Sequence, residues 1–580
     1  MPLPTDPPDD LTDPSDVPNS RPASLAPGRD LPSRPPDPGP EPSVPAAAPA
    51  DPTAARPADL GHQRALATVR ALRNASAGGV VVGADVKGLR WCEPEQAVMV
   101  LGPPRSGKTS GVIVPSIVAA PGAVVATSTK PDVASATAAI RRGLGPCLLY
   151  DPSGTVPPVP GTEPLHWSPV HACRSWDEAV LLAAEMVETA GRLRGAGGRL
   201  EAASHWTERA TALLAPLLHA AALLEAPMAE VLHWVDTRQP DPALAALSDA
   251  AADVALDGLS GVLATEQREQ SGIWSTAAGS LAAYRSTAAL RSTEGPAFDP
   301  RAFLDAGGTL YVVAAGSRQR TLAPLVVGLL GQIRQAVYDR AAAWALARPD
   351  TDQRPPAVLF ALDELANIAP LPDLPAMVSE AGGQGLTVLA CLQDLSQARA
   401  RWGLAAEGFP SLFGYTLVLP GIGDVATLRA LSALAGDHEE RRVSLSHPLP
   451  APTTGARALA RRLLLGPDPA GRPRPTRTLA PVHRPRLPVD VLARGQPGHA
   501  VLVDPRNRLT TVRLTPWFAA EPWRSLLDPR SPGLPGRPEP GADPDPRPEA
   551  QRVAPWPEAQ SRPATPHRAV APDPGHPFEP

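Results

Sequence analysis

The 580-residue chain contains little lysine, little cysteine and few aromatic residues. Lysine occurs only at positions 87, 108 and 130, so arginine carries nearly all of the positive charge. The net charge of −5 is too small to argue for or against a nucleic-acid partner. A motif that requires lysine therefore has very few places where it can match by chance.

The four cysteines are scattered along the chain, and no pair has the spacing of metal ligands. Two of them, Cys147 and Cys391, lie inside apolar runs that are typical of buried strands. We therefore expect buried, reduced thiols in a cytosolic protein rather than a disulfide-bonded secreted domain.

Long apolar runs are also missing. The best candidate for a membrane span, residues 212–224, covers about 13 residues where about 20 are needed, and Pro216 and His219 interrupt it. It is predicted to be a buried helix. Residues 1–30 are acidic and proline-rich, unlike a signal peptide.

Proline is concentrated at the two ends, with about 18 prolines in the first 60 residues and about 17 in the last 60. The ends also lack apolar periodicity. Residues 1–60 and 527–580 are therefore predicted to be disordered tails, which leaves 61–526 as the folded part.

The most specific feature is a match to G-x-x-x-x-G-K-[ST], the phosphate-binding loop of P-loop NTPases. The loop and the residue after it, which are expected to bind nucleotide, are Gly102, Pro103, Pro104, Arg105, Ser106, Gly107, Lys108, Thr109 and Ser110. An apolar run at 97–101 predicts a buried strand before the loop, and 109–119 predicts a helix after it, with Pro115 within or near its end.

This order aims backbone N–H groups and the positive end of a helix at a polyphosphate. Lys108 is expected to reach the β- and γ-phosphates of ATP, and the Thr109 hydroxyl to bind Mg²⁺. The alternative, a plain glycine-rich turn, requires a chance match of the order of a few in a thousand.

Strand and helix patterns alternate around the loop. Strands are predicted at 79–83, 123–127 and 147–150, with a helix from Pro131 to about Arg142, which is the pattern of a parallel α/β sheet. From about 175 to 293 the spacing of alanine and leucine is helical. The predicted organisation is a nucleotide-binding domain in two parts, 61–165 and 301–526, around an all-helical insertion at 166–300, in which tryptophans 167, 206, 234 and 274 are expected in the core.

The second part resumes with a strand at 308–314, a helix at 322–345 and an apolar strand from 357 that ends in Asp363 and Glu364. Such an ending is typical of the second nucleotide motif, Walker B. Asp363 is expected to hold Mg²⁺, and Glu364 to orient and deprotonate the attacking water.

Another predicted strand, 386–392, ends at Gln393, which could sense the γ-phosphate or position the water; alternatively it is a solvent-facing cap. Further elements are predicted at 416–419, 424–434 and 499–503. Between the last two, residues 441–489 carry ten arginines against one aspartate. They form either a solvated loop or a basic segment that meets nucleic acid or an acidic partner.

Several motifs occur together in an order that resembles the TraG/TraD type IV coupling proteins, the conjugative DNA-transfer ATPases. They are the P-loop with Gly111 and Pro115, the Ser-x-Lys-Pro-Asp at 128–132, Gly-Thr-Leu-Tyr-Val at 308–312, Asp-Glu-Leu-Ala at 363–366, the strand from Gly385 to Gln393, and the series Gly421, Asp424, Thr427, Leu431, Ser432 and Gly436. The resemblance covers about 79–520.

The resemblance implies a RecA-like P-loop ATPase with an all-helical domain that assembles as a homo-hexamer. It would couple ATP hydrolysis to the movement of single-stranded DNA, or of a DNA–relaxase complex, into a type IV secretion channel. The helical insertion would contact the relaxosome. The expected location is the cytoplasm, at the inner face of the cell membrane.

The sequence departs from this family in two ways. The family usually begins with transmembrane helices, so membrane attachment would here come from a partner, or the chain is a soluble branch. Some members carry an arginine shortly before the glutamine strand, where this chain has Ala381-Gly382-Gly383-Gln384. An arginine finger would come from Arg318, Arg399 or Arg401, or be missing.

Other functions remain open from the sequence. A RecA-like DNA translocase without a secretion system, and a nucleotide-binding receptor that does not hydrolyse, share the P-loop; the second would need neither Glu364 nor Gln393. A metabolic kinase fits poorly, because no small-substrate lid is recognisable.

Overall fold

The computed structural model describes residues 57–194, 200–314, 316, 318–351, 353–446, 456–465 and 476–528. The predicted tails lie outside these ranges except at their inner ends: helix α1 (Pro57–Ser76) begins before residue 61, and helix α20 (Trp523–Leu527) reaches residue 527. None of the helices in these ranges is both long and apolar enough to cross a membrane. The predicted buried helix at 212–224 is part of helix α5 (Leu200–Leu223).

Within the described residues, one large sheet has twelve strands in the order β2-β1-β14-β13-β10-β3-β9-β8-β4-β7-β5-β6. They are β1 (Val81–Asp85), β2 (Gly88–Trp91), β3 (Val98–Leu101), β4 (Val124–Ser128), β5 (Cys147–Tyr150), β6 (Glu163–Pro164), β7 (Thr309–Val313), β8 (Val358–Leu362), β9 (Leu386–Leu392), β10 (Tyr415–Val418), β13 (His499–Val503) and β14 (Leu509–Arg513).

The strands from β10 to β6 in this order pair in parallel. The strands on the other side of β10 pair antiparallel. The predicted α/β fold with a mostly parallel sheet is confirmed. The strand expected at 79–83 lies at 81–85 in the antiparallel part, and β2, β6 and β14 were not predicted.

The parallel strands β3, β4, β7, β8, β9 and β10 are buried on both faces, which explains their largely apolar sequences, whereas the edge strand β6 is exposed. In β3, Met99 and Leu101 belong to one hydrophobic cluster, and Val98 and Val100 to another. Helices α2 (Val114–Ala119) and α3 (Asp132–Arg141) cover the second face. The first face is covered by α12 (Gln319–Ala347), α13 (Leu365–Ile368), α14 (Leu374–Ala381) and α15 (Leu395–Trp402).

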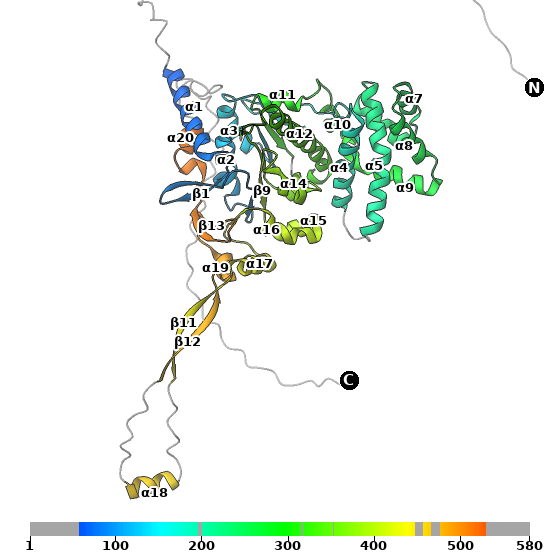
Figure 1. The fold of residues 1–580 in the computed structure, drawn as a ribbon. Coiled ribbons are helices and arrows are strands. Elements are labelled where there is room, and N and C mark those ends of the chain that lie inside the picture. Colours follow the sequence, from blue (N-terminus) through cyan, green and yellow to red (C-terminus); the bar gives the residue numbers. More distant parts are fainter. Residues whose placement is uncertain are drawn as a thin grey trace, which may run out of the picture. The chain divides into compact units, whose positions relative to one another are not determined.

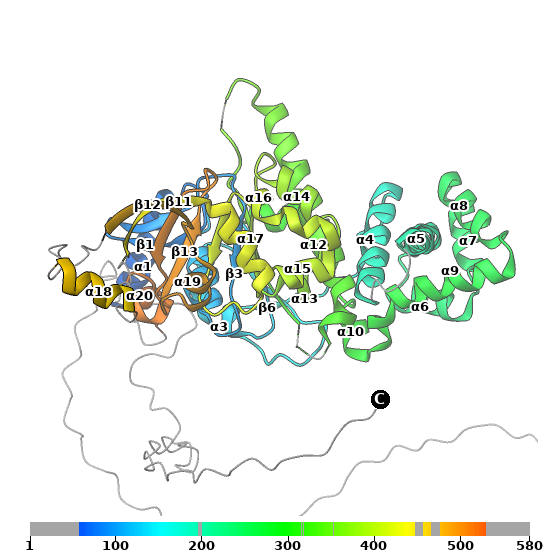
Figure 2. The same cartoon turned by 90° about the horizontal axis from the view of Figure 1, so that it is seen from below.

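The helical insertion packs against α12 through α4. Its elements are α4 (Trp176–Arg194), α5 (Leu200–Leu223), α6 (Met228–Thr237), α7 (Asp241–Asp249), α8 (Asp253–Leu263), α9 (Gln267–Ser280), the 3₁₀ turn η2 (Ala282–Arg285) and α10 (Thr287–Arg291) (Figures 1 and 2). Trp167, Trp234 and Trp274 are buried in the core, and Trp206 is partly buried against it. No strand interrupts the described residues between 175 and 293, as predicted.

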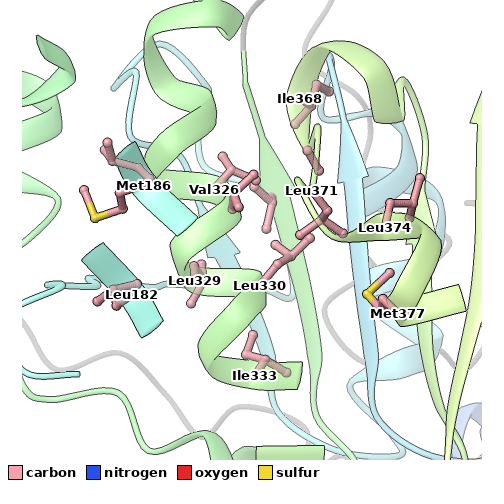
Figure 3. Close-up of a cluster of buried hydrophobic side chains, with 14 of the residues drawn as sticks. Leu182, Met186, Val326, Leu329, Leu330, Ile333, Ile368, Leu371, Leu374 and Met377 are labelled. Carbon is pink, nitrogen blue, oxygen red and sulfur yellow. The ribbon is translucent and has the colours of Figure 1, made fainter. Parts of the chain in front are cut away.

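Helix α12 joins the insertion to the sheet. Figure 3 shows Val326 and Leu329 of α12 near Leu182 and Met186 of α4, while Leu330 lies towards Leu371, Leu374 and Met377. Arg334, on the same helix, donates to Glu185 of α4 at 2.7 Å and also pairs with Asp373, just before α14. The insertion is therefore tied to the segment that follows β8.

The arginine-rich region contains an element that was not predicted. Strand β11 (Asp437–Ser446) pairs antiparallel with β12 (Thr476–Pro485) as a separate two-stranded sheet, and α18 (Ala456–Leu465) lies between them in sequence. The remaining short elements of the described residues are α11 (Pro300–Asp305), η3 (Gly403–Gly408), α16 (Phe409–Leu412), α17 (Val425–Ala435), α19 (Val489–Arg494) and η4 (Trp517–Ala519).

All four cysteines are buried free thiols, as expected.

Candidate nucleotide-binding site

The predicted P-loop connects β3 to a helix that begins with an irregular turn. Residues Thr109–Ile113 form a π-helical turn, η1, in which the Val114 N–H donates to the Thr109 carbonyl, and α2 follows. Pro115 lies just after the junction of η1 and α2, where the helix continues without a break and Pro115 has no N–H to donate to the preceding turn. Arg105 and Gly107 have positive φ angles of 64° and 96°. The sharp turn they allow brings the loop back over the end of β3.

The Lys108 side chain lies inside this loop and is only 6% exposed. Its ammonium donates to the carbonyls of Gly102, at 2.5 Å, and Pro103, at 2.9 Å. These contacts hold a buried positive charge next to the backbone of the loop, which is where a polyphosphate would bind.

Thr109 and Asp363 meet although 254 residues separate them in the sequence. The Thr109 hydroxyl donates to Asp363 Oδ2 at 2.6 Å, and Thr127 of β4 donates to the Asp363 carbonyl at 2.8 Å. Burial raises the pKa of Asp363, the neighbouring Glu364 acts in the same direction, and the hydrogen bond from Thr109 opposes both. A nearby cation would offset this cost of ionisation.

Glu364, the residue after Asp363, has a left-handed backbone conformation with φ of 52°. Its N–H donates to Asp363 Oδ1 at 3.1 Å, and its Oε2 accepts from Asn367 Nδ2 at 3.1 Å. The strained backbone and the amide together fix the direction of the carboxylate. No motif marks Asn367 in the sequence; its spacing of three residues from Glu364, about one helical turn, was the available signal.

A cavity of about 560 Å³ lies against these residues. It is lined by Pro104, Arg105, Ser106, Gly107, Lys108, Thr109, Ser110, Val114, Ser128, Thr129, Lys130, Asp132, Val133, Asp363, Glu364, Trp517 and Phe518. The structure thus brings most of the predicted site residues together. The two aromatic residues were not predicted, since no motif marks them.

Gln393 comes directly after β9, which lies between β3 and β8 in the sheet. The neighbouring Leu392 carbonyl accepts from the Gly102 N–H at 3.1 Å, so Gln393 lies beside the start of the P-loop. Its own N–H donates to Gln397 Oε1 at 2.9 Å. Neither Gln393 nor Gly102 nor Pro103 lines the cavity.

The residues present fit a nucleoside triphosphate with Mg²⁺. A hydroxyl and a carboxylate 2.6 Å apart are oxygen ligands of the kind Mg²⁺ uses when phosphates supply the rest of its shell. A larger cavity, of about 620 Å³, is lined by Gly78, Glu95, Pro121, Ala357 and Gly385 among others. Glu95, Pro121, Ala357 and Gly385 come just before parallel strands, whereas ligands of such sheets bind at the carboxyl ends of the strands.

Each of the three arginines predicted as possible fingers has a hydrogen-bond partner within the chain. Arg399 pairs with Asp424 at 2.7 Å, and Arg401 donates to the Ala366 carbonyl at 2.8 Å. Arg318 is exposed just before α12 and donates to the Ser153 carbonyl at 3.3 Å.

Residues 62–467 match the family described as type IV secretory system conjugative DNA transfer. The chain belongs to this family. A solved structure of the bacterial conjugative coupling protein TrwBdeltaN70 in its unbound form is 18% identical, with a TM-score of 0.54 over 77% of this chain and 91% of that one. The plasmid coupling protein TrwB in complex with ADP and Mg²⁺ is also 18% identical, with a TM-score of 0.53 over 76% of this chain and 88% of that one.

A comparison with curated proteins gave no match. The structural likeness agrees with the RecA-like P-loop fold expected from the sequence.

Proposed function

We propose that this protein is an ATP-hydrolysing coupling motor that delivers DNA, single-stranded or bound to a relaxase, to a type IV secretion channel. The observation that carries the proposal is the contact of Thr109 with Asp363 at 2.6 Å, beside the buried Lys108. This contact brings the P-loop next to the carboxylate proposed as Walker B. The chain that contains both belongs to the conjugative DNA-transfer family. Structures of TrwB in complex with ADP and Mg²⁺, and with a non-hydrolysable ATP analogue, support this assignment.

In this proposal each group of site residues has a separate role in ATP binding and hydrolysis. The backbone N–H groups of residues 105–110 and the Lys108 ammonium would bind the phosphates, while Thr109 and Asp363 would hold Mg²⁺, which would neutralise phosphate charge. Glu364, held by Asn367, accepts a proton from the attacking water. Gln393 would reach the γ-phosphate from the tip of the adjacent strand.

Assembly and location are part of the same proposal. We assign 61–165 and 301–526 to the motor and 166–300 to the helical insertion, which would contact the relaxosome. Homo-hexamers would place a neighbour's cation at each site, and the exposed Arg318 suits that role better than the paired Arg399 and Arg401. The hexamer would act in the cytoplasm, at the inner face of the membrane beside channel proteins.

The test is the ATPase rate of the purified full-length protein with and without single-stranded DNA, beside Lys108→Ala. We expect turnover that DNA stimulates and that the variant loses. ATP binding without turnover under both conditions would contradict the motor and favour a nucleotide-binding receptor. Turnover that DNA does not change would contradict the coupling to DNA.

A further inference from the structure

Two aromatic residues that the phosphate chemistry does not use line the nucleotide cavity. They are Trp517 and Phe518 of η4, and Ser110 and Val114 of the P-loop helix line the same cavity. Their rings lie edge to face, with centroids 5.6 Å apart and an interplanar angle of 81°. Trp517 is half-buried at the edge of a hydrophobic cluster, whereas Phe518 is 56% exposed. Both rings line the nucleotide cavity, so their aromatic surface is available to a ligand bound there.

The segment that carries the two rings is fixed to the P-loop helix. A methyl group placed on Gly111 would lie 3.6 Å from Leu514 Cβ and 4.0 Å from the Thr515 carbonyl oxygen. After the rings, α20 packs into a cluster that also contains Val114 and Val118 of α2. The position of the aromatic pair is therefore set by the same helix that would bind the phosphates.

The direction of the nucleotide follows from the P-loop. Lys108 and Glu364 mark the end where the γ-phosphate would lie, and the N–H groups at the start of the helix, including that of Ser110, would contact the α-phosphate. The ribose and base must continue outward from that turn. Val114 is about one helical turn beyond Ser110, and both residues line the same cavity as the aromatic pair.

We propose that Trp517 and Phe518 form the platform on which the base of the nucleoside triphosphate stacks; this inference rests on the proposed function. Stacking on an aromatic ring accepts any base, and its strength rises with the area of the ring system. The site should therefore favour purine over pyrimidine nucleotides and distinguish adenine from guanine only weakly.

The test measures the affinities of the full-length protein for ATP, GTP, CTP and inorganic tripolyphosphate by calorimetry with Mg²⁺ present. We expect Phe518→Ala and Trp517→Ala to weaken ATP and GTP binding by about 5- to 100-fold and to leave tripolyphosphate binding unchanged. Phe518→Tyr and Trp517→Phe should stay near the parent value because they retain a ring. Trp344→Ala is the matched control, since Trp344 lies on α12 and bonds to the Gln353 carbonyl, away from the cavity.

Unchanged tripolyphosphate affinity shows that each variant is folded. If the parent binds ATP and both alanine variants bind it with the same affinity, the assignment of the stacking platform is wrong while the proposed function stands. The same conclusion follows if the parent binds CTP as tightly as ATP. If the parent binds neither ATP nor tripolyphosphate, the proposed function fails and the platform fails with it.

Discussion

Replacing Glu364 by glutamine tests the assignment of the general base most directly. Glutamine keeps the size of the side chain and can still accept from Asn367 through its carbonyl oxygen. It cannot take a proton from water. General-base catalysis contributes about 10²- to 10⁴-fold, so we expect kcat to fall by about that factor while ATP affinity stays within about threefold. Phosphate release and calorimetric ATP binding measure the two quantities.

Two companion substitutions separate chemistry from geometry. Asn367→Ala removes a 3.1 Å hydrogen bond to a carboxylate, worth about 1.5–3 kcal/mol, and should lower kcat by about 10- to 100-fold with ATP binding retained. Glu364→Gly also removes the base, but it relieves a φ of 52° that costs a non-glycine residue about 1 kcal/mol. The glycine variant should be inactive and at least as thermally stable as the parent. Turnover of Glu364→Gln near the parent rate would refute the assignment.

Two further predictions concern the metal ligand and the arginine-rich hairpin. Burial raises the pKa of Asp363 above its unfolded value, so its ionisation lowers the stability of the ligand-free fold progressively between the unfolded pKa and the raised pKa, and fully above the raised pKa. Asp363→Asn should therefore raise Tm at pH 7, lose this advantage as the pH falls from the raised pKa to the unfolded pKa, and lack Mg²⁺-dependent turnover. A Tm difference that does not shrink at low pH would argue against this cause. Replacing 447–475 by Asn-Gly keeps the β11–β12 ladder but removes five arginines. If this segment meets DNA, the slope of log affinity for single-stranded DNA against log salt should decrease by up to about 3.5, whereas an unchanged slope would identify a loop without DNA contacts.

The sequence was sufficient for the local parts of the site. The P-loop pattern depends on residues within eight positions of one another, and its strand and helix were predicted close to their observed bounds. Strand β8 was recognisable because a strand buried on both faces is continuously apolar, so the two carboxylates after Leu362 stand out. The parallel α/β fold followed from the alternation of such strands with helices.

Contacts between distant segments were decided only by the tertiary structure. The pattern of a buried strand is the same wherever it lies in a sheet, so nothing local places β9 between β3 and β8. The β11–β12 hairpin escaped prediction because its strands are rich in charged and proline residues and carry little apolar alternation. Trp517 and Phe518 reach the nucleotide cavity because η4, which carries them, contacts η1 at the start of the P-loop helix, and no motif records a contact between segments so far apart in the sequence.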